Sequence, residues 1–317
     1  MNQYSQSIRI PEKGANLRLL IIDDDRVDRL NIRRCVSKAG FNASYVEADD
    51  LRSGFEEFNK GRYDCIFVDY MLPDGDGIDF INKVKERGCF TPIIMLTGQG
   101  SEEIAASAIT SGACDYLTKH NIPQIDFLGV VKDSFKRANI EADLYKNAHY
   151  DKLTGLFNRF YFERHLSGTI QRSKRHSHNF AVMFLDLDKF KSVNDTYGHD
   201  FGDKVLKEAS LRIDKCIRDS DIAARFGGDE FAIILEEIDN QGEESCKIVA
   251  ERIINSIREP FVVKDIIINI GVSIGIAIYS GSGEYPEDLI KLADEAMYQA
   301  KKEEDGHYRF ALNKKVA

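Results

Sequence analysis

The sequence contains few cysteines and no motif that would pair them or use them to bind metal. The six cysteines are scattered without CxxC or similar spacing, and several lie inside apolar runs such as CIFVD. This pattern favours buried free thiols in a reducing compartment over a disulfide framework or a zinc site.

Targeting and membrane-spanning segments are also lacking. The first residues, MNQYSQSIRIPEKG, have no apolar core of the kind found in signal peptides. The most apolar stretch, IIINIGVSIGIAIY, is β-branched, interrupted by Asn and Ser, and too short to cross a bilayer as a helix. We therefore expect a cytoplasmic protein.

The sequence has no excess of positive charge. Its 317 residues include 52 Asp and Glu against 43 Lys and Arg, a formal net charge of −9. Nucleic acids and anionic membranes bind chiefly to basic surfaces, so neither is expected as a partner. With 43% hydrophobic and 30% charged residues the composition is typical of globular proteins. The length allows about two domains.

Short apolar runs alternate with helical patterns from residue 17 to about 120. The runs are LRLLII, YVEA, CIFV, PIIML and CDYLT. This alternation predicts a doubly wound α/β domain with five parallel strands, whose sites lie at the carboxyl ends of the strands. The residues at or just after four of these ends are Asp23-Asp24-Asp25, Asp69, Thr97 and Lys119.

These strand-end side chains together suit phosphoryl chemistry. Clustered carboxylates repel unless a hard cation such as Mg²⁺ lies between them, and a carboxylate beside that cation can attack a phosphoryl donor. A lysine and a hydroxyl can then pair with the transferred oxygens. Each residue alone also has an ordinary explanation, as a helix cap or a solvent-facing lysine. Their joint occurrence at four strand ends favours a site.

Residues 17–137, which follow a tail of residues 1–16, resemble a response-regulator receiver domain with a flavodoxin-like fold. The motifs that carry the resemblance are IIDDD, VDYMLPDGDG, IIMLTG and GACDYLTK. The resemblance implies that Asp69 is the phosphoacceptor for a cognate histidine kinase. The implied ligands of Mg²⁺ (or Mn²⁺) are Asp23, Asp24, Asp69 and the Met71 carbonyl. The implied switch residues are Thr97, Tyr116 and Lys119.

One residue departs from the receiver pattern. His120 stands where the family usually has proline after the lysine. Cis peptides are essentially a proline phenomenon, so we do not expect the cis bond that is common there.

A heptad stripe continues past this domain into residues 138–150, which we expect to be a helical linker that prolongs the last receiver helix. The stripe, spaced alternately by three and four residues, consists of Leu128, Val131, Phe135, Ala138, Ala142, Tyr145 and His149. Packing on the receiver domain explains its first half. Beyond Ala138 the sequence indicates no receiver core left to cover, which favours a two-helix stalk between two protomers.

The pattern of apolar and polar residues changes from Asp151 onward. FAVMFLDLDKF predicts a buried strand that ends in acids, and DIAARFGGDEFAIIL predicts a hairpin turning at Gly227-Gly228. FVVKDIIINIGVSIGIAIY predicts a long apolar hairpin, and PEDLIKLADEAMYQAKK a final amphipathic helix. The order predicts an α+β layer, an antiparallel sheet with helices on one face.

Three carboxylates of this half converge if the acid-ended strand lies beside the hairpin. Asp186 would then meet Asp229 and Glu230, and such a group calls for a divalent metal. The two glycines make a sharp turn and let another molecule approach the backbone closely. A large anion held through Mg²⁺, most commonly a nucleoside triphosphate, is the expected occupant.

Residues 151–317 resemble a GGDEF domain, the family of diguanylate cyclases. The resemblance is carried by DKLTGLFNR, FLDLDKFKSVNDTYGHDFGD, RFGGDEF, VSIGIA and ADEAMYQAKK. It implies a fold related to nucleotide cyclases. The implied reaction condenses two GTP into cyclic di-GMP with release of two pyrophosphates.

The resemblance also assigns residues. The implied metal ligands are Asp186, the Leu187 carbonyl, Asp229 and Glu230. Asp229 and Glu230 form the catalytic pair, with Glu230 as a second metal ligand or as the base for the 3′-hydroxyl. The implied substrate contacts are Asn194 and Asp203 to guanine and Lys301 to the terminal phosphates. Apart from the resemblance, Lys191 could help neutralise phosphate, although a lysine after a strand is commonly solvent-facing. The family's Gly-Arg after Lys301 is replaced by a glycine and His307, so a histidine stands where the family has its second cation.

An RxxD pattern precedes the glycines by five residues. Arg218 and Asp221 match the family's inhibitory product site, where arginine can fork onto guanine or phosphate and aspartate can accept from guanine donors. Arg and Asp near a helix end are also routine without any ligand.

The implied reaction needs two facing GTP molecules, whereas one domain binds one. Activity would therefore require a two-fold homodimer, and phosphorylation of Asp69 would set the spacing of the two half-sites through the stalk. The alternative is a non-catalytic response regulator that binds GTP or cyclic di-GMP and signals through partners, and a further one is a dimerising scaffold. Asp186, Asp229 and Glu230 are all retained, which favours the enzyme.

Overall fold

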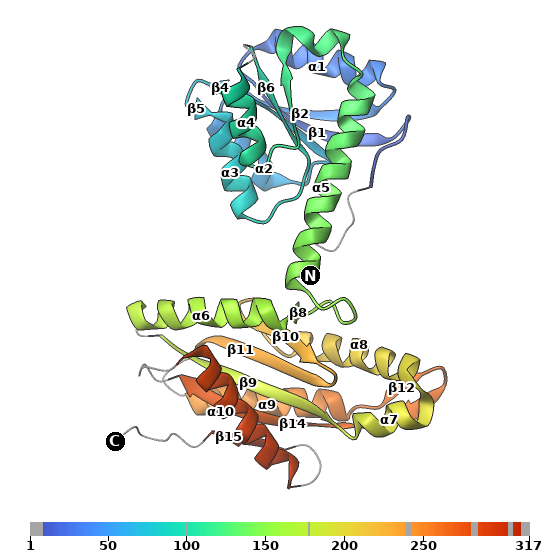
Figure 1. Cartoon of the computed structure of the whole chain (residues 1–317), viewed down its shortest axis with the longest axis vertical. Helices are drawn as coiled ribbons and strands as arrows, with labels where there is room; N and C mark the ends of the chain where they lie inside the picture. The colour runs from blue at the N-terminus through green and yellow to red at the C-terminus, as the bar shows by residue number, and fades with distance from the viewer. Residues whose placement is uncertain are drawn as a thin grey trace. The chain divides into compact units, whose positions relative to one another are not determined.

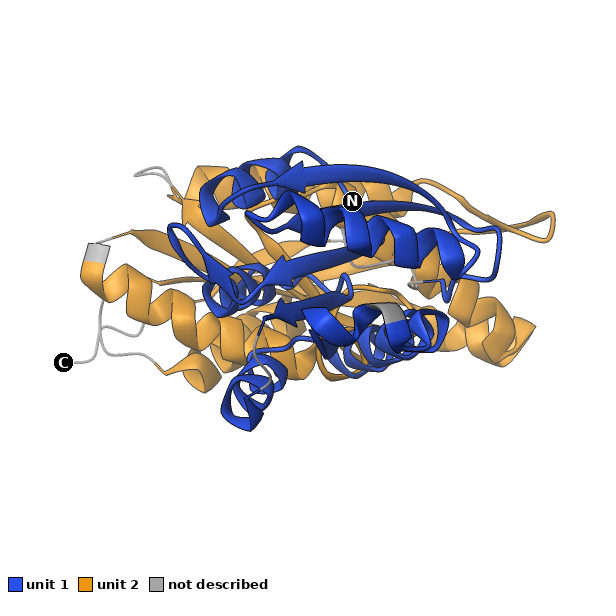
Figure 2. Cartoon of the chain, turned by 90° about the horizontal axis from the view of Figure 1, so that it is seen from above, with its two compact units in different colours: residues 1–145 blue, residues 146–317 orange. Residues whose placement is uncertain are grey.

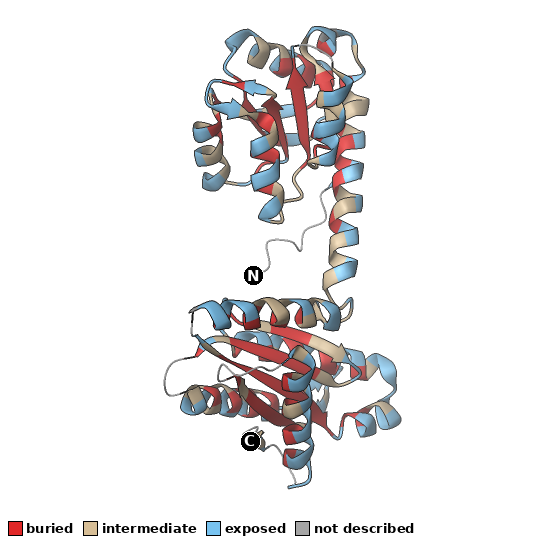
Figure 3. Cartoon of the chain, turned by 60° about the vertical axis from the view of Figure 1, so that its left-hand side comes forward, coloured by how far each residue is buried: buried red, intermediate tan, exposed pale blue. Residues whose placement is uncertain are grey.

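The chain divides into two compact units, residues 1–145 and 146–317 (Figure 2). The computed structural model describes residues 9–98, 101–176, 178–238, 242–279, 285–303 and 307–311. In both units the strands are mostly buried and the exposed surface lies on the outer sides of the helices (Figure 3).

The first unit is built on a parallel sheet. Its strands are β1 (Asn16–Ile22), β2 (Asn42–Ala48), β3 (Cys65–Asp69), β6 (Ile93–Thr97) and β7 (Asp115–Thr118), labelled in part in Figure 1. In the described residues these five strands run in the order β2-β1-β3-β6-β7, and all neighbours are parallel. The predicted five-stranded doubly wound sheet is therefore confirmed, and its switch point lies between β1 and β3.

Helices cover both faces of this sheet because its central strands are apolar on both sides. Leu19 and Ile21 of β1 face α1 and α5, whereas Leu20 and Ile22 face the opposite core. The helices are α1 (Arg26–Lys38), α2 (Leu51–Lys60), α3 (Gly77–Glu86), α4 (Glu102–Thr110) and α5 (Phe127–His149), with the short pieces β4 (Met71–Leu72), β5 (Gly75–Asp76) and η1 (Lys119–Gln124). No described peptide bond is cis, as expected from His120.

The apolar stripe of α5 contacts its own unit further along than the sequence suggested. Ala142 is buried, and the Tyr145 ring packs on Phe90 with 5.1 Å between the ring centroids. Lys85 of α3 also reaches Glu141 at 2.6 Å. The expectation that the stripe has nothing to cover beyond Ala138 is thus wrong, because the segment that follows α3 packs against this part of α5.

The second unit contains a mixed sheet. Its strands are β8 (Phe157–Asn158), β9 (Asn179–Asp188), β10 (Ile222–Gly227), β11 (Glu230–Ile238), β14 (Gly271–Tyr279) and β15 (Tyr308–Phe310). They run in the order β15-β14-β9-β11-β10-β8 within the described residues. The pairs from β14 to β10 are antiparallel as predicted, and the edge strands β15 and β8 are parallel to their neighbours.

Helices of this unit lie on both faces of the sheet, so the expectation of helices on one face is wrong. The first face carries α6 (Arg159–His176) and α10 (Pro286–Lys301). The second carries α7 (Phe190–Tyr197), α8 (His199–Lys215) and α9 (Gly242–Arg258). The apolar run of β9 explains the difference, because a strand buried on both faces has no alternation of polar and apolar residues. The predicted apolar face of α10 is confirmed: Leu289, Ala293, Ala296, Met297 and Ala300 are buried.

Two hairpins differ from their predicted positions. Gly227 pairs with Glu230, so Gly228 and Asp229 form the turn instead of Gly227-Gly228. Gly228 has a φ of +49°, which glycine adopts readily. The stretch from 261 to 279 is not one long hairpin but a short one, β12 (Phe261–Val263) with β13 (Ile266–Ile268), followed by the central strand β14.

Candidate active site and phosphoacceptor site

In the first unit, three acids gather at the carboxyl edge of the sheet. Asp23 follows β1 and Asp69 ends β3, and these strands are neighbours. One carboxylate oxygen from each of Asp23, Asp24 and Asp69 lies within 4.8 Å of the others. Asp23 and Asp69 are buried and Asp24 is exposed. Oxygen ligands at this spacing fit a hard cation such as Mg²⁺.

Lys119 neutralises part of this cluster. Its Nζ lies 2.9 Å from Asp23 Oδ2 and 2.8 Å from Asp69 Oδ2. It also contacts Asp28 Oδ2 at 2.9 Å, a partner that the strand-end analysis did not include. An acid in the first turn of α1 was the available signal, since that helix begins directly after the β1 acids.

Burial sets the protonation of this cluster. It raises the pKa of Asp23 to about 6 even though a hydrogen bond from Lys119 lowers it. Burial also raises the pKa of Asp69 against the same lysine. Burial lowers the pKa of Lys119, but its three carboxylate partners outweigh that effect and raise it overall. Buried carboxylates that resist ionisation are stabilised by a cation, which supports the fit to a metal.

The other predicted receiver residues lie around this edge. Thr97 ends β6 and is buried, one residue beyond the partner of Asp69 in the strand pairing. Tyr116 lies in β7 and is half-buried. Met71 begins β4, two residues after Asp69, with its side chain exposed. Their proposed roles as phosphate contact, switch and carbonyl ligand stay predictions.

In the second unit, the carboxylates of the predicted catalytic group lie on two adjacent central strands. Asp186 of β9 is directly opposite Glu230, the first residue of β11. Asp229 lies in the preceding turn, and its carbonyl accepts a hydrogen bond from Leu187 N at 3.2 Å. This bond ties the turn to the end of β9 and keeps the three carboxylates at one edge of the sheet.

Lys301, at the end of α10, reaches this group. Its Nζ lies 2.6 Å from Asp186 Oδ1. Burial raises the pKa of Asp186, and this lysine opposes the shift while Asp229 adds to it. Burial is the largest cause that raises the pKa of Glu230. The negative charges of Asp186, Asp294 and Asp229 raise it further. The sequence analysis did not single out Asp294, a residue of α10.

The carboxylates of the second unit are less tightly grouped than those of the first. Among the described residues, only Asp23, Asp24 and Asp69 place three ligand oxygens within 4.8 Å of one another. Asp186 is instead paired with Lys301. The negative charge of Asp229 nonetheless raises the pKa of both Asp186 and Glu230, so a divalent cation would relieve a repulsion that exists here.

The predicted guanine-binding residues lie where α7 meets α8. A Cβ on Gly202 would overlap Asn194 Oδ1, so the absence of a side chain there allows the two helices to approach closely. Asp203 is the next residue and is exposed. Lys191, on the first turn of α7, is exposed as well. The structure thus places the Asn194 side chain against Gly202, the residue before Asp203.

A buried aspartate that the sequence analysis did not assign ends β9. Asp188 accepts a hydrogen bond from Ser273 Oγ of β14 at 2.7 Å. The signals were the second acid of DLD and the serine of VSIGIA. This bond joins the end of β9 that carries Asp186 to β14, the neighbour of β9 on the side away from β11.

The RxxD pair has structural partners. Asp221 is buried, and its carboxylate accepts hydrogen bonds from Arg218 N at 2.8 Å and Glu236 N at 3.1 Å. Arg218 is exposed. Asp221 therefore fixes the loop before β10, and the Arg218 side chain lies at the surface above it.

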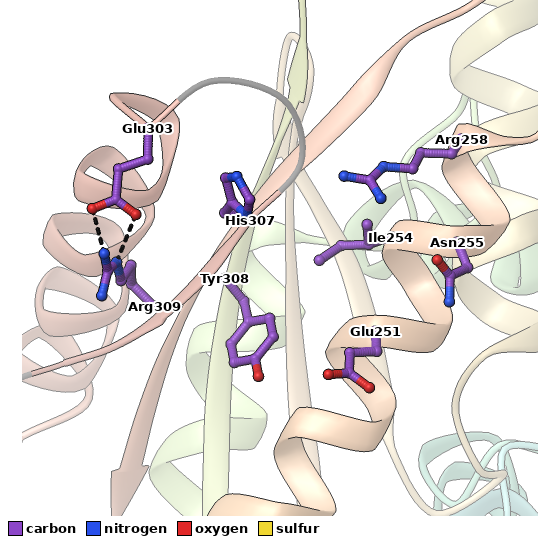
Figure 4. Close-up of a pocket in the computed structure, with 8 residues that line it drawn as sticks. All are labelled: Glu251, Ile254, Asn255, Arg258, Glu303, His307, Tyr308 and Arg309. Carbon is purple, nitrogen blue, oxygen red and sulfur yellow. Dashed lines mark hydrogen bonds and ion pairs between the residues drawn. The ribbon is translucent and has the colours of Figure 1, made fainter.

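A cavity of about 520 Å³ lies between α9 and β15 (Figure 4). Arg258 and His307 both line it, and His307 is the residue that replaces the family's arginine. Arg309, two residues later, pairs with Glu303 (Figure 4). Part of the segment KKEEDGHYRF, residues 304–306, lies outside the described residues.

Comparison with known proteins gives the family. The model of "Diguanylate cyclase, GGDEF domain" matches residues 148–307, and that of "Response regulator receiver domain" matches residues 19–126. The chain belongs to the GGDEF family. It carries the family's signature at residues 227–231, with a receiver domain before it.

Two relatives match different shares of the chain. Response regulator PleD of Caulobacter vibrioides is 30% identical to this GGDEF chain over 301 residues, which are 91% of this chain and 64% of PleD. Diguanylate cyclase TpbB of Pseudomonas aeruginosa is 40% identical over 171 residues, 54% of this chain and 39% of TpbB. The chain thus spans less than two thirds of the length of either relative.

A solved structure shares the fold of the second unit. The coiled coil and GGDEF domain of DgcB from Caulobacter crescentus, in complex with c-di-GMP, aligns with a TM-score of 0.50 and 27% identity. The alignment covers 56% of this chain and 91% of that one. In the part of the GGDEF chain that the structure describes, no helix is long and apolar enough to cross a bilayer.

Proposed function

We propose that this chain is a phosphorylation-regulated diguanylate cyclase, which condenses two GTP into cyclic di-GMP with release of two pyrophosphates and acts as a dimer. The observation that carries the proposal is Asp186 opposite Glu230 on adjacent strands, with Asp229 in the turn beside them. Family membership and the relative named as a diguanylate cyclase support the same reaction.

Residues of the second unit would bind and orient GTP. Asn194 and Asp203 would hold guanine at the close contact of α7 with α8. Asp186, Asp229 and the Leu187 carbonyl would hold Mg²⁺, which supplies charge neutralisation and polarises the phosphate. Lys301 is 43% exposed at its side chain, so it can exchange Asp186 for the terminal phosphates.

The chemical step is a displacement at the α-phosphorus. The 3′-oxygen of one GTP forms a bond to the α-phosphorus of the other, the bond to the β-phosphate breaks, and pyrophosphate leaves. Glu230 either completes the metal coordination or takes the 3′-hydroxyl proton; its raised pKa brings the carboxylate closer to the range of an effective base. Repetition with the roles exchanged closes the ring.

The dimer follows from this stoichiometry, because each domain supplies one GTP. On α5 the side chains of Ile140 and Leu144 are 60% and 63% exposed and lie four residues apart. Such a pair can pack against the same pair of a second copy. Phosphorylation of Asp69 would change the charge beside Lys119, Asp23 and Asp28 and thereby bias how two receiver domains pair.

Turnover of purified protein tests the proposal. Wild type is incubated with GTP and Mg²⁺, with and without beryllofluoride, and cyclic di-GMP and pyrophosphate are quantified. We expect both products, and a rate that changes with beryllofluoride in wild type but not in Asp69→Asn. The matched control is Asp79→Asn, an exposed acid of α3, which should respond like wild type.

Two results would contradict the proposal separately. A rate that responds equally in Asp69→Asn removes the phosphorylation control but keeps the enzyme. No cyclic di-GMP under either condition, together with measurable binding of GTP or cyclic di-GMP, identifies the alternative, a non-catalytic regulator.

A further inference from the structure

Glu236 occupies an unusual place at the end of β11. The pairing of β11 with β9 shifts between Leu235 and Ile238, and Glu237 has a φ of +49°. An irregularity of this kind redirects the side chain and frees backbone groups from the sheet. The freed Glu236 N–H donates to Asp221 Oδ1 at 3.1 Å, so the strand end is bonded to the Arg218–Asp221 loop.

The Glu236 carboxylate faces the other way, onto α6. Its Oε1 lies 2.9 Å from His165 Nε2, 2.7 Å from Thr169 Oγ1 and 2.8 Å from an Arg172 Nη atom. These three residues share one face of α6, at intervals of four and three. Burial raises the pKa of Glu236, but its hydrogen bonds with His165 and Thr169 lower it overall, so the carboxylate is held ionised.

Aromatic contacts continue from His165 back to the end of α5. The His165 ring stacks with Tyr161 at 5.9 Å between centroids, and Tyr161 stacks with Phe157 at 4.0 Å. Phe157 stacks with Tyr150 at 4.7 Å, and His149, the last residue of α5, meets Tyr161 at 5.4 Å. All of these residues belong to the second unit. A continuous set of packed rings thus joins the end of α5 to Glu236.

We propose that Glu236 is a positioning residue that couples α6, and through it the end of α5, to the Arg218–Asp221 loop. The coupling is reciprocal: a ligand on the loop changes the packing of α6, and a shift of α6 changes the loop. The ligand part rests on the product site that the resemblance assigns to Arg218 and Asp221. The mechanical part rests only on the contacts of Glu236 and is tested without any ligand.

Hydrogen exchange of the full-length protein tests the mechanical part. We expect Glu236→Ala to speed exchange of the Arg218 amide, which donates to Asp221, by about tenfold, within the 5–150-fold range usual for coupled sites. Amides of the central part of β9 should keep the wild-type rate, because the change is local. Glu237→Ala, an exposed neighbour with the same loss of charge, is the matched control and should match wild type.

A second variant tests the contact between Glu236 and α6 by changing the residue on the helix. Thr169→Val keeps the shape of the side chain but removes the hydroxyl that donates to Glu236. Thr169→Val should also speed exchange of the Arg218 amide, but by a smaller factor than Glu236→Ala does. If either variant speeds exchange in α6 and leaves Arg218 unchanged, the coupling does not exist. If β9 speeds up equally, Glu236 acts only on global stability, and the proposal fails.

Calorimetric binding of cyclic di-GMP tests the ligand part. The Kd of wild type and Glu237→Ala should agree, whereas Glu236→Ala should bind about tenfold more weakly. Saturating cyclic di-GMP should slow exchange in α6 of wild type. An equal Kd for Glu236→Ala overturns the coupling to ligand. A wild type that binds no cyclic di-GMP overturns the product site itself, and the exchange result at Arg218 then decides the coupling alone.

Discussion

Individual carboxylates of this chain differ in their partners, and the partners determine what each group can do. Asp69 and Asp23 share the ammonium group of Lys119 with Asp28. Asp186 is held by Lys301, whose partner can be exchanged for a phosphate. Asp221, in contrast, accepts from two backbone amides, which explains its burial without any ligand.

Glu230→Gln should lower kcat of cyclic di-GMP synthesis by at least about 100-fold, the usual size of a lost acid–base or charge contribution. The substitution keeps the shape of the residue, so the thermal midpoint should stay close to that of wild type. Initial rates with GTP and Mg²⁺ provide the measurement. Glu237→Gln, an exposed acid on the same strand, is the control, and equal rates for the two variants would remove Glu230 from the mechanism.

Asp151→Asn should destabilise the second unit by about 1.5–3 kcal/mol, the range for a hydrogen bond to a charged group. Asp151 Oδ1 accepts hydrogen bonds from Thr154 N at 2.9 Å and from Thr154 Oγ1 at 2.7 Å. Arg225 Nη1 donates to the same oxygen at 3.1 Å. Burial raises the pKa of Asp151, but the bonds from Thr154 and Arg225 outweigh it and lower the pKa below its ordinary value of 3.8.

The pH dependence of this variant has a definite sign. A carboxylate whose folded pKa is depressed adds stability above its unfolded pKa and loses it as the pH falls through the folded value. The stability difference between wild type and Asp151→Asn should therefore be constant above about pH 5 and narrow below pH 3.8. Urea unfolding at several pH values measures it, and a difference that widens in acid would contradict the assignment.

At the scale of elements, close backbone approach decides how α10 packs. A Cβ on Gly275 of β14 would overlap backbone atoms of Ala293 and Met297 on α10. The glycine of VSIGIA thus lets the helix lie directly on the central strand beside Asp186 and carries Lys301 to the acid group.

Gly275→Ala should cost about 3 kcal/mol or more of stability in the second unit, because neither backbone can move aside without disturbing the sheet. Lys301 would shift as well, so KM for GTP should rise in whatever fraction stays folded. Gly168→Ala is the matched control: it lies in α6, meets only the flexible end of Arg172, and should stabilise by about 0.5–1 kcal/mol. Equal behaviour of the two variants would contradict the packing argument.

At the scale of the whole molecule, the chain contains two units with separate cores and separate acid clusters. The first cluster lies at the carboxyl ends of parallel strands, and the second lies where β9 ends and the antiparallel strand β11 begins. Ligands of one unit should therefore act first on the stability of that unit, which makes their effects separable.

Beryllofluoride with Mg²⁺ should raise only the unfolding transition of the first unit, and GTP with Mg²⁺ only that of the second. At 100 times Kd a ligand adds about 2.7 kcal/mol to the unit that it binds. Differential scanning calorimetry resolves the two transitions, and EDTA should abolish both shifts. Asp69→Asn should lose the first shift and keep the second. A beryllofluoride effect that persists in this variant would place the phosphoacceptor elsewhere.

The sequence by itself determined the features that depend on local pattern. The five apolar runs of the first unit, the acids at their ends and the apolar face of α10 could all be predicted, because strand and helix periodicities are properties of neighbouring residues. The GG of RFGGDEF predicted a turn, and only its position was wrong by one residue, since a pairing register depends on the partner strand.

Only the tertiary structure decided which distant groups meet. Lys301 and Asp186 are 115 residues apart in sequence, and Glu236 reaches His165 across 71 residues. No local pattern encodes such pairs, because they result from how the helices pack on the sheet. The same packing buried Ala142 of α5 and brought the Tyr145 ring onto Phe90. It also covered the second face of the sheet in the second unit, which the apolar run in β9 indicated without showing which helices do so.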